Sequence, residues 1–451
     1  MSTQNRREYL TTTPIPKLIM TLSFPTIISM LVTGIYNTAD TFFVSRVSSN
    51  PDINTYAMAA VGIAFPIMAI IQAFGFFCGH GSGNYISRML GAGKHKEADE
   101  MASTGLAISI ILGLFFAIIG NVLLDNISVM LGADSAQTLA YTKDYLRIIL
   151  IGAPFMMAQF VINNQLRFQG SAYFAMIGLM SGAIMNMVLD PLLIWGFHME
   201  VTGAAIATVM GQITSFFVLL IGTTKGENIK LSLKKVKVNA HYIGEIINGG
   251  IPSLFRQGLA AYATLKLNTQ AGIFGYDAAI AGMSIATKIL MLMVSALIGF
   301  GQGYQPVCSF NYGAGLTARV KEGFYFCLKY ATVFLICVGT ACYCFAPNLI
   351  GLFSKDAAAV EVAVKSLRFQ CMTLFLSAPI IMSNMMLQSI GKGLKASITA
   401  SARNGICFIP MILLLPRFFG ITGVEIAQPC ADVLSAIIAV PMAYSELRKF
   451  K

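Results

Sequence analysis

The fold is decided by the stretch "LIMTLSFPTIISMLVTGIYNTADTFFVS", residues 18–45, which is apolar over almost its whole length. About 20 consecutive apolar residues are enough for an α-helix to cross a bilayer, so this stretch predicts a membrane-spanning helix. One residue breaks the pattern, because Asp40 lies near the far end. A carboxylate at the bilayer centre costs about 2.5–3.5 kcal/mol on insertion scales, so Asp40 requires an explanation.

The composition of the whole chain agrees with a membrane protein. Of its 451 residues, 56% are hydrophobic and only 11% are charged. A soluble protein carries roughly 25% charged residues, so we expect lipid to cover this one. The nine cysteines show no disulfide, redox or zinc spacing and are interpreted as small buried apolar residues. No cleavable signal segment is recognised, so the first apolar stretch is expected to remain as a helix.

The basic residues are unevenly distributed between the apolar segments. They account for a net charge of +11 and fall mostly in alternate gaps, above all in the segment 225–240. This alternation is the positive-inside pattern of a multi-pass membrane protein, and it predicts that both termini are cytoplasmic. Nucleic-acid binding would require a basic face with base-reading side chains, and neither is present.

The apolar segments predict an all-α integral membrane protein with twelve transmembrane helices. An even number of helices agrees with both termini lying on one side of the membrane. The predicted helices cover residues 17–45, 57–89, 99–123, 138–167, 173–197, 202–223, 241–272, 278–310, 321–346, 360–390, 396–415 and 420–444.

The two halves of the chain repeat each other. "CGHGSGNY" at 78–85 corresponds to "GFGQGYQP" at 299–306, and "VTGAAIA" at 201–207 corresponds to "ITGVEIA" at 421–427. Six helices return the chain to its starting side, so the repeats are parallel. Two six-helix bundles with a central cavity between them are typical of transporters. The predicted organisation is an N-lobe at 1–224, a cytoplasmic connector at 225–240 and a C-lobe at 241–451.

The glycine triplets of the repeat have two interpretations. Gly-x-Gly-x-Gly is part of a dinucleotide-binding fingerprint, but here no strand precedes it and no acidic residue follows at a suitable distance. Small residues also allow transmembrane helices to pack closely. We therefore predict close helix contacts at these glycines.

Counting along the helices brings several polar residues to one depth. At 1.5 Å per residue, Asp40 lies about 9 Å from the outer end of the first helix, and Asp190 and Thr208 each lie about 12 Å from theirs. Asn186 is one turn from Asp190 on the same face. Tyr145 lies close to the outer end of the fourth helix. The outer half of the first repeat is therefore predicted to hold a polar cluster.

This cluster has the chemistry of a cation site. Two neighbouring carboxylates cannot both be ionised cheaply in a low-dielectric environment, so the pair can hold a proton or bind a monovalent cation. Asn37, three residues before Asp40, can join it. A purely structural role stays open, because Asp190 precedes Pro191 and suits a helix cap at a break, and hydrogen bonds can neutralise Asp40. Intramembrane acids are nevertheless usually functional.

The second half is interpreted differently, because its intramembrane ionisable residues are mainly basic. These are Arg256, Lys266, Lys288 and Arg403, and Pro410 stands where the first repeat has Asp190. We expect the ion chemistry to belong to the first half only. The basic residues can form salt bridges, extend toward the membrane surface, or line the cavity.

The substrate and the energy source are constrained by composition and by missing motifs. The chain is rich in Met, with 25 residues, and in Phe and Tyr, which can line an adaptable cavity for flat lipophilic compounds. Candidate cavity residues are Tyr36, Asn37, Met291, Arg256 and Lys288. No metal spacing, nucleophile motif or Walker loop is found, so we expect neither an enzyme nor a cofactor, and ATP is not the direct energy source.

Several motifs resemble one known family. "LSFPTIISMLVTGIYNTADTFFV", "ISRMLGAGKHKEA", "RFQGSAY" and "MNMVLDPLLIWGFHMEVTGAAIAT", together with the 6+6 repeat, resemble the multidrug and toxic compound extrusion (MATE) family over essentially the whole chain. The similarity is strongest to the bacterial MepA-like drug-efflux branch, and it implies a bacterial inner membrane. It implies a V-shaped pair of six-helix lobes that alternate their access, driven by entry of H⁺ or Na⁺.

The resemblance also implies roles for individual residues. The family's N-lobe cation site corresponds to Asp40, Asn186, Asp190 and Thr208, with Tyr145 nearby, and Pro25 to the proline about which the first helix bends. A sodium-coupled branch has a second site with an acid in the pattern "FQCMD". Here the stretch is "FQCMT", residues 369–373, and Thr373 replaces that acid.

These observations predict a multidrug antiporter that exchanges lipophilic, cationic compounds for H⁺ or Na⁺. Its partners would be drug-like small molecules and the lipid bilayer, without nucleic acid, and we expect a monomer. A flippase for lipid-linked precursors stays an alternative because of Arg256, Lys266 and Lys288. A membrane receptor or scaffold that transports nothing is a further alternative.

Overall fold

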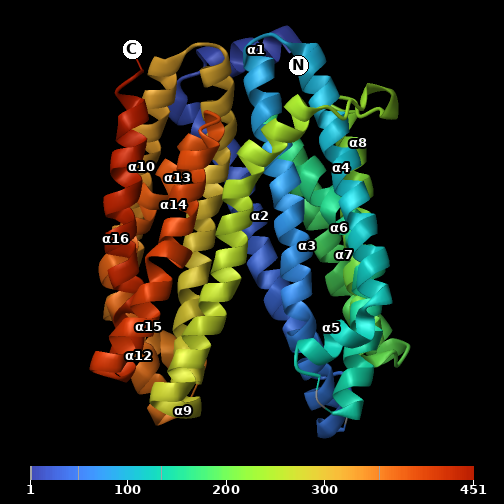
Figure 1. The fold of residues 1–451 in the computed structure, drawn as a ribbon, viewed down its shortest axis with the longest axis vertical. Coiled ribbons are helices and arrows are strands. Elements are labelled where there is room, and N and C mark those ends of the chain that lie inside the picture. Colours follow the sequence, from blue (N-terminus) through green and yellow to red (C-terminus); the bar gives the residue numbers. More distant parts are fainter. Residues whose placement is uncertain (1–2, 49, 134, 355, 451) are drawn as a thin grey trace. The chain divides into compact units, whose positions relative to one another are not determined.

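The structure, a computed structural model, describes residues 3–48, 50–133, 135–354 and 356–450, and the side chains of residues 3–5 and 35–39 lie outside the description. Every regular element in these ranges is helical (Figure 1). The elements of the first half are α1 (Thr3–Thr12), α2 (Ile15–Val44), α3 (Pro51–Gly91), α4 (His95–Val122), α5 (Leu124–Met130), α6 (Ala136–Phe168), α7 (Ala172–Pro191), the π-helical turn η1 (Leu192–Gly196), α8 (Glu200–Thr223) and the 3₁₀ turn η2 (Leu233–Lys235).

The second half has the same kind of organisation. Its elements are α9 (Ala240–Gly313), α10 (Thr317–Cys344), α11 (Ala346–Gly351), α12 (Ala357–Thr373), the 3₁₀ turn η3 (Leu374–Leu376), α13 (Ser377–Ser389), α14 (Gly393–Ser401), the π-helical turn η4 (Ala402–Ile406), α15 (Phe408–Phe419) and α16 (Ile421–Leu447).

The predicted transmembrane helices are confirmed. Within the described ranges, eleven helices are long and apolar enough to cross a membrane. One of them, α9, contains 74 residues and has a non-helical residue, Tyr276, with φ 54° and ψ −158°. It therefore contains both predicted helices, 241–272 and 278–310. The short helices α1, α5 and α11 were not predicted, because they lack the length of an apolar span.

The chain forms two compact units that share two helices. Unit 1 contains the residues up to Leu10 and Ile28–Gly250, and unit 2 contains Thr11–Ile27 and the residues from Ile251 onward. The start of α2 therefore belongs to unit 2 and its remainder to unit 1, whereas α9 begins in unit 1 and continues in unit 2. Each of these helices passes from one unit to the other.

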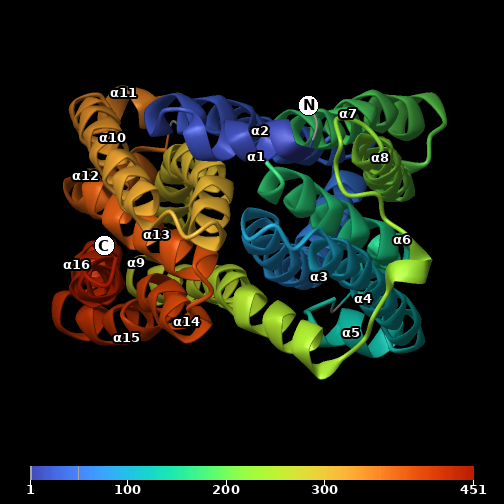
Figure 2. The same ribbon diagram turned by 90° about the horizontal axis from the view of Figure 1, so that it is seen from above.

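In unit 1, α6 is the central helix. It packs against α3, α4, α7 and α8, and α7 also packs along α8 (Figure 2). In the first part of α6, apolar residues such as Tyr145, Ile149 and Ala153 belong to the buried core. The last part also buries polar residues, among them Asn163 and Gln165. In unit 2, α16 packs against α12, α13, α15 and η4.

The glycine triplet of α3 allows a close helix contact in unit 1. A Cβ atom on Gly81 would lie 2.9 Å from Ile246 Cα at the start of α9, and one on Gly249 would lie 3.1 Å from Gly81 Cα. Only glycines fit at such separations. The triplet packs helices, as predicted.

The second triplet has the same role in unit 2, between α9 and the start of α2. A Cβ atom on Gly299 would lie 2.7 Å from Ile27 Cα, and one on Gly303 would lie 2.5 Å from Ser23 N. The Thr26 hydroxyl donates a hydrogen bond of 2.6 Å to the carbonyl of Gly299. These contacts hold the start of α2 against unit 2.

The repeat is also visible in individual hydrogen bonds. In unit 1, Asn163 Nδ2 donates to the carbonyl of Ala175 at 2.9 Å. In unit 2, Asn384 Nδ2 donates to the carbonyl of Ala396 at 2.7 Å. The first bond joins α6 to the start of α7, and the second joins α13 to the start of α14, at equivalent places in the repeat. The two halves therefore share their internal contacts as well as their sequence pattern.

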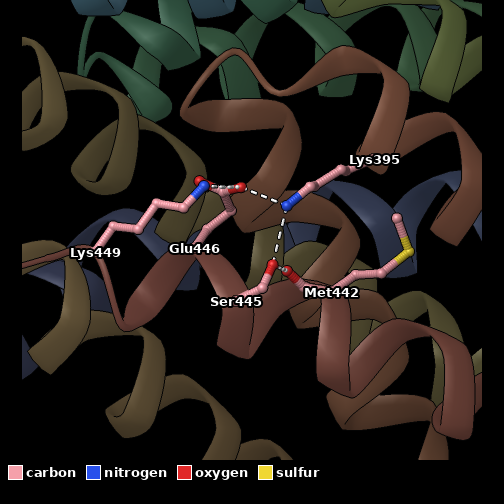
Figure 3. Close-up of polar contacts among 5 residues, drawn as sticks. All are labelled: Lys395, Met442, Ser445, Glu446 and Lys449. Carbon is pink, nitrogen blue, oxygen red and sulfur yellow. Dashed lines mark hydrogen bonds and ion pairs between the residues drawn. The ribbon is translucent and has the colours of Figure 1, made fainter.

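A buried ion pair joins the start of α14 to the end of α16 in unit 2. Glu446, near the end of α16, accepts from Lys395 Nζ at 2.5 Å and from Lys449 Nζ at 2.9 Å (Figure 3). Lys395 also donates to the hydroxyl of Ser445 at 2.9 Å, and that hydroxyl donates to the carbonyl of Met442. The Glu446 side chain is only 3% exposed, so two lysines compensate a buried charge and fix α14 to α16.

Candidate functional site

Asp190 is the most completely buried acid of unit 1. It lies near the end of α7, where Pro191 interrupts the helical hydrogen bonds and the π-helical turn η1 follows. Its side chain is 0% exposed, and both of its carboxylate oxygens are buried without a hydrogen-bond partner. A buried charge without partners is costly, so this carboxylate requires a bound cation or a proton.

Asn186 and Thr208 lie side by side next to it. Asn186 is one turn before Asp190 on α7, and its Nδ2 donates to Thr208 Oγ1 on α8 at 3.4 Å. The amide oxygen of Asn186 stays buried and without a partner. Gly211 allows this approach of the two helices, since a Cβ atom there would lie 3.1 Å from Asn186 Cβ. The predicted proximity of this amide and this hydroxyl is therefore present in the structure.

Asp40 provides the second carboxylate, near the end of α2. Its Oδ1 is buried and has no hydrogen-bond partner. The carboxyl groups of Asp40 and Asp190 are close enough to interact electrostatically. Tyr36 and Asn37, which we predicted as cavity or cluster residues, lie outside the residues whose side chains are described. Pro25 is buried inside α2, two residues before the point at which this helix passes to unit 1.

Two residues of α6 have buried hydroxyl groups. Tyr145 is buried, and its hydroxyl donates to Met68 Sδ at 3.8 Å. Thr142, three residues earlier on the same face, is fully buried, and its hydroxyl oxygen has no partner. The sequence reasoning missed Thr142. Its signal was the spacing to Tyr145, which a search for acids does not use.

The unpartnered oxygens define what the site can bind. They belong to Asp40, Asp190 and Asn186, and all are acceptors without a donor. Among the described residues, no group of three or more His, Cys, Asp or Glu side chains could hold a metal ion. Two carboxylates, an amide and a hydroxyl have the chemistry to bind a proton or a monovalent cation such as Na⁺.

The basic residues of unit 2 do not form one group. Arg256 Nη1 on α9 donates to Asn384 Oδ1 on α13 at 3.3 Å. Lys266 Nζ lies 5.5 Å from the ring centre of Tyr262. Lys288 and Met291 are exposed on the protein surface, Met291 to 62%.

Unit 2 also contains buried acids, which corrects one expectation. Arg403 forms an ion pair with Asp432 on α16, at 2.8 Å between Nε and Oδ1. Glu425 on the same helix is 1% exposed. The prediction that the ionisable groups of this half are mainly basic takes no account of these two acids, because the depth count follows the equivalents of Asp190 and not the whole of the last helix.

Two units of apolar helices related by a repeat, with buried carboxylate oxygens that lack hydrogen-bond partners, have the architecture of a multi-pass membrane transporter. The profile of the MatE family matches residues 25–192 and 252–414, one match in each half. The chain belongs to the MatE family.

Similar proteins cover nearly the whole chain. The multidrug export protein MepA of Staphylococcus haemolyticus (strain JCSC1435) is 30% identical over 97% of this chain and 95% of its own length. MepA of Staphylococcus aureus (strain MRSA252) is 28% identical over the same shares. A solved outward-facing multidrug resistance MATE family transporter of the MOP superfamily has a TM-score of 0.91 and 27% identity, covering 98% of both chains. The chain therefore has the twelve-helix, two-lobe fold of MATE transporters.

Proposed function

We propose that this protein is a secondary multidrug exporter that moves lipophilic, cationic compounds outward in exchange for H⁺ or Na⁺. The observation that carries the proposal is the group of buried, unpartnered oxygens of Asp40, Asp190 and Asn186 in unit 1. The multidrug export role of the MepA relatives supports the choice of substrate class. The membrane is a bacterial inner membrane with both chain termini in the cytoplasm, and the protein acts as a monomer.

The energy comes from the entering cation. One positive charge that enters a cell with an inside-negative potential of 100 mV releases about 2.3 kcal/mol. The cation binds between Asp40 and Asp190 and removes the cost of their uncompensated charge. For this energy to be used, the cation must bind more tightly to the state from which the drug has left.

Helix α2 provides the connection between the cation and the rest of the protein. Its second part carries Asp40 and belongs to unit 1, whereas its first part packs against unit 2 through Ser23 and Thr26. Pro25 removes a helical hydrogen bond just before the change of unit, so α2 can bend there. Binding of a cation at Asp40 therefore alters a helix that both units share.

Export of a fluorescent cation tests this function. A bacterial host without drug exporters of its own, expressing this chain, is expected to export ethidium several-fold faster than the same host with an empty vector. A protonophore combined with a sodium ionophore should abolish the difference, because both gradients then collapse. Equal ethidium export with and without the chain, together with transbilayer movement of a lipid-linked diphosphate, would support a flippase instead.

A further inference from the structure

A stripe of polar residues runs along one face of α16 in unit 2. Glu425, Gln428, Asp432 and Ser435 follow each other at spacings of three and four residues, which places them on one side of a helix. The acids and the serine are buried, with Glu425 at 1%, Asp432 at 2% and Ser435 at 0% exposure. Buried acids in a membrane helix are rare and usually functional.

The repeat shows that the acids of this stripe are particular to unit 2. The equivalent positions of α8 hold Ala205, Thr208, Gln212 and Ser215, without an acid. Unit 1 instead places its acid on α7, as Asp190. The second half therefore carries its carboxylates on a different helix. Packing alone does not require an acid at position 425, since alanine is accommodated at the equivalent place, Ala205.

The centre of the stripe is fully compensated. Asp432 Oδ1 accepts from Arg403 Nε at 2.8 Å and from Gln428 Nε2 at 2.9 Å, and its Oδ2 accepts from Arg403 Nη2 at 3.4 Å. Arg403 comes from η4, a π-helical turn, and such turns occur frequently at functional sites. Asp432 therefore has its own permanent countercharge.

At each end of the stripe, one buried oxygen atom has no hydrogen-bond partner. Glu425 Oε2 is buried and has no hydrogen-bond partner, and the same is true of Ser435 Oγ. The equivalent hydroxyl in unit 1, Ser215 Oγ, donates to the carbonyl of Gly178 at 2.8 Å. The unpartnered groups are thus not imposed by the repeat.

The charged groups around Glu425 do not neutralise it by contact. From α12, Glu361 and Lys365 act on it electrostatically, but they form an exposed pair with each other at 2.7 Å. Arg403 is bound to Asp432. Arg368 of α12 donates to the carbonyl of Tyr343. Arg417 of α15 is exposed, Lys395 of α14 is bound to Glu446, and α13 and η3 carry no charged residue. Helix α9 also contacts the start of α16 at Gly275; in this part of α9, Asp277 and Lys288 are exposed and Lys266 lies over the ring of Tyr262.

We propose that Glu425 is a second coupling site, located in unit 2, that takes up and releases one proton in each transport cycle. The proton adds to the unpartnered Oε2 and converts the carboxylate to a neutral acid. Na⁺ fits less well, because it requires several oxygen ligands and both oxygens of Asp432 are already bound. This inference rests on the proposed function. In each transport cycle, the proton carried by Glu425 enters in addition to the cations that enter through unit 1.

The steady concentration ratio of ethidium across the membrane, reached under a fixed pH gradient, tests this site. Purified protein is reconstituted in proteoliposomes without Na⁺, the membrane potential is held at zero with valinomycin and equal K⁺, and a pH gradient drives ethidium to its steady ratio. That ratio depends on the number of coupled protons and not on the orientation of the protein. Glu425→Gln is expected to lower it about tenfold for each unit of pH gradient, because one coupled proton is lost.

Two further variants make the result specific. Glu425→Ala introduces the residue of the equivalent position in α8 and should give the same loss. Glu361→Gln removes an exposed charge from the same neighbourhood and should leave the ratio at its wild-type value. A wild-type ratio in both Glu425 variants, with only the rate altered, would overturn the proposal and make Glu425 structural.

A measurement on protein with an intact Glu425 covers the case in which its variants do not fold. Ethidium binding to detergent-solubilised Asp40→Asn/Asp190→Asn protein should still release about one proton, detected with a pH indicator, because cation and substrate compete. No proton release would overturn the proposal. Failure of the proposed function has a different signature, since wild-type proteoliposomes would then accumulate no ethidium under either a pH or a Na⁺ gradient.

Discussion

Replacing both acids of unit 1, Asp40→Asn together with Asp190→Asn, is expected to remove the coupling of ethidium export to the cation that enters through unit 1. An asparagine can neither hold a proton nor supply a negative charge to Na⁺. At 100 mV the loss of one coupled charge, about 2.3 kcal/mol, lowers the limiting ethidium gradient about 50-fold. The measurement is the steady ethidium ratio in proteoliposomes with an imposed membrane potential.

The control for this pair is an acid of the same unit that lies at the surface. Asp125 forms an ion pair with Lys143 at 2.5 Å, but its side chain is 73% exposed. Asp125→Asn should leave the steady ratio unchanged. Coupling through unit 1 would be refuted if the double variant reached the wild-type ratio, because the buried carboxylates would then not bind the driving cation.

A second large effect is expected from one methyl group at the contact between α2 and α9. A Cβ atom on Gly303 would meet the backbone of Ser23, which cannot move like a flexible side chain. Gly303→Ala is therefore expected to destabilise the protein by about 1–3 kcal/mol through overpacking. Thermal unfolding of the detergent-solubilised protein, followed by circular dichroism, should show a midpoint several degrees below wild type.

The matched control lies on the same helix. Gly258 of α9 has no atom within 4 Å of the place where a Cβ would stand. Gly258→Ala should be neutral or stabilising by about 0.5–1 kcal/mol, since alanine is the better helix former. Equal midpoints for the two alanine variants would show that the close contact at Gly303 does not hold α2 in place.

The fold was largely predictable because the membrane imposes strong rules. Each span must be long and apolar, so length and charge alone located the helices, and the glycine triplets indicated close packing. The break between the predicted helices 241–272 and 278–310 coincides with the non-helical residue Tyr276 of α9. One feature was not predictable in this way. The passage of α2 and α9 between the units depends on long-range contacts that a local pattern does not encode.

The candidate site was predicted in part, for a similar reason. Depth counting uses only the rise per residue, so it selected Asp40, Asp190 and Thr208, but it carries no information on which faces meet. Thr142 was missed because a hydroxyl in an apolar helix is unremarkable in sequence. Glu425 was missed inside a quoted motif, "ITGVEIA", because the repeat comparison recorded agreement and not the replacement of alanine by an acid.

The central claim is that a cation moving inward drives a drug outward. The most direct test imposes a pH gradient and a Na⁺ gradient separately across proteoliposomes that contain the wild-type protein, and measures ethidium movement against its own concentration gradient. We predict that at least one of the two gradients drives this movement and that a protein-free liposome shows none. Ethidium that only equilibrates down its own gradient, whichever cation gradient is applied, would contradict the account.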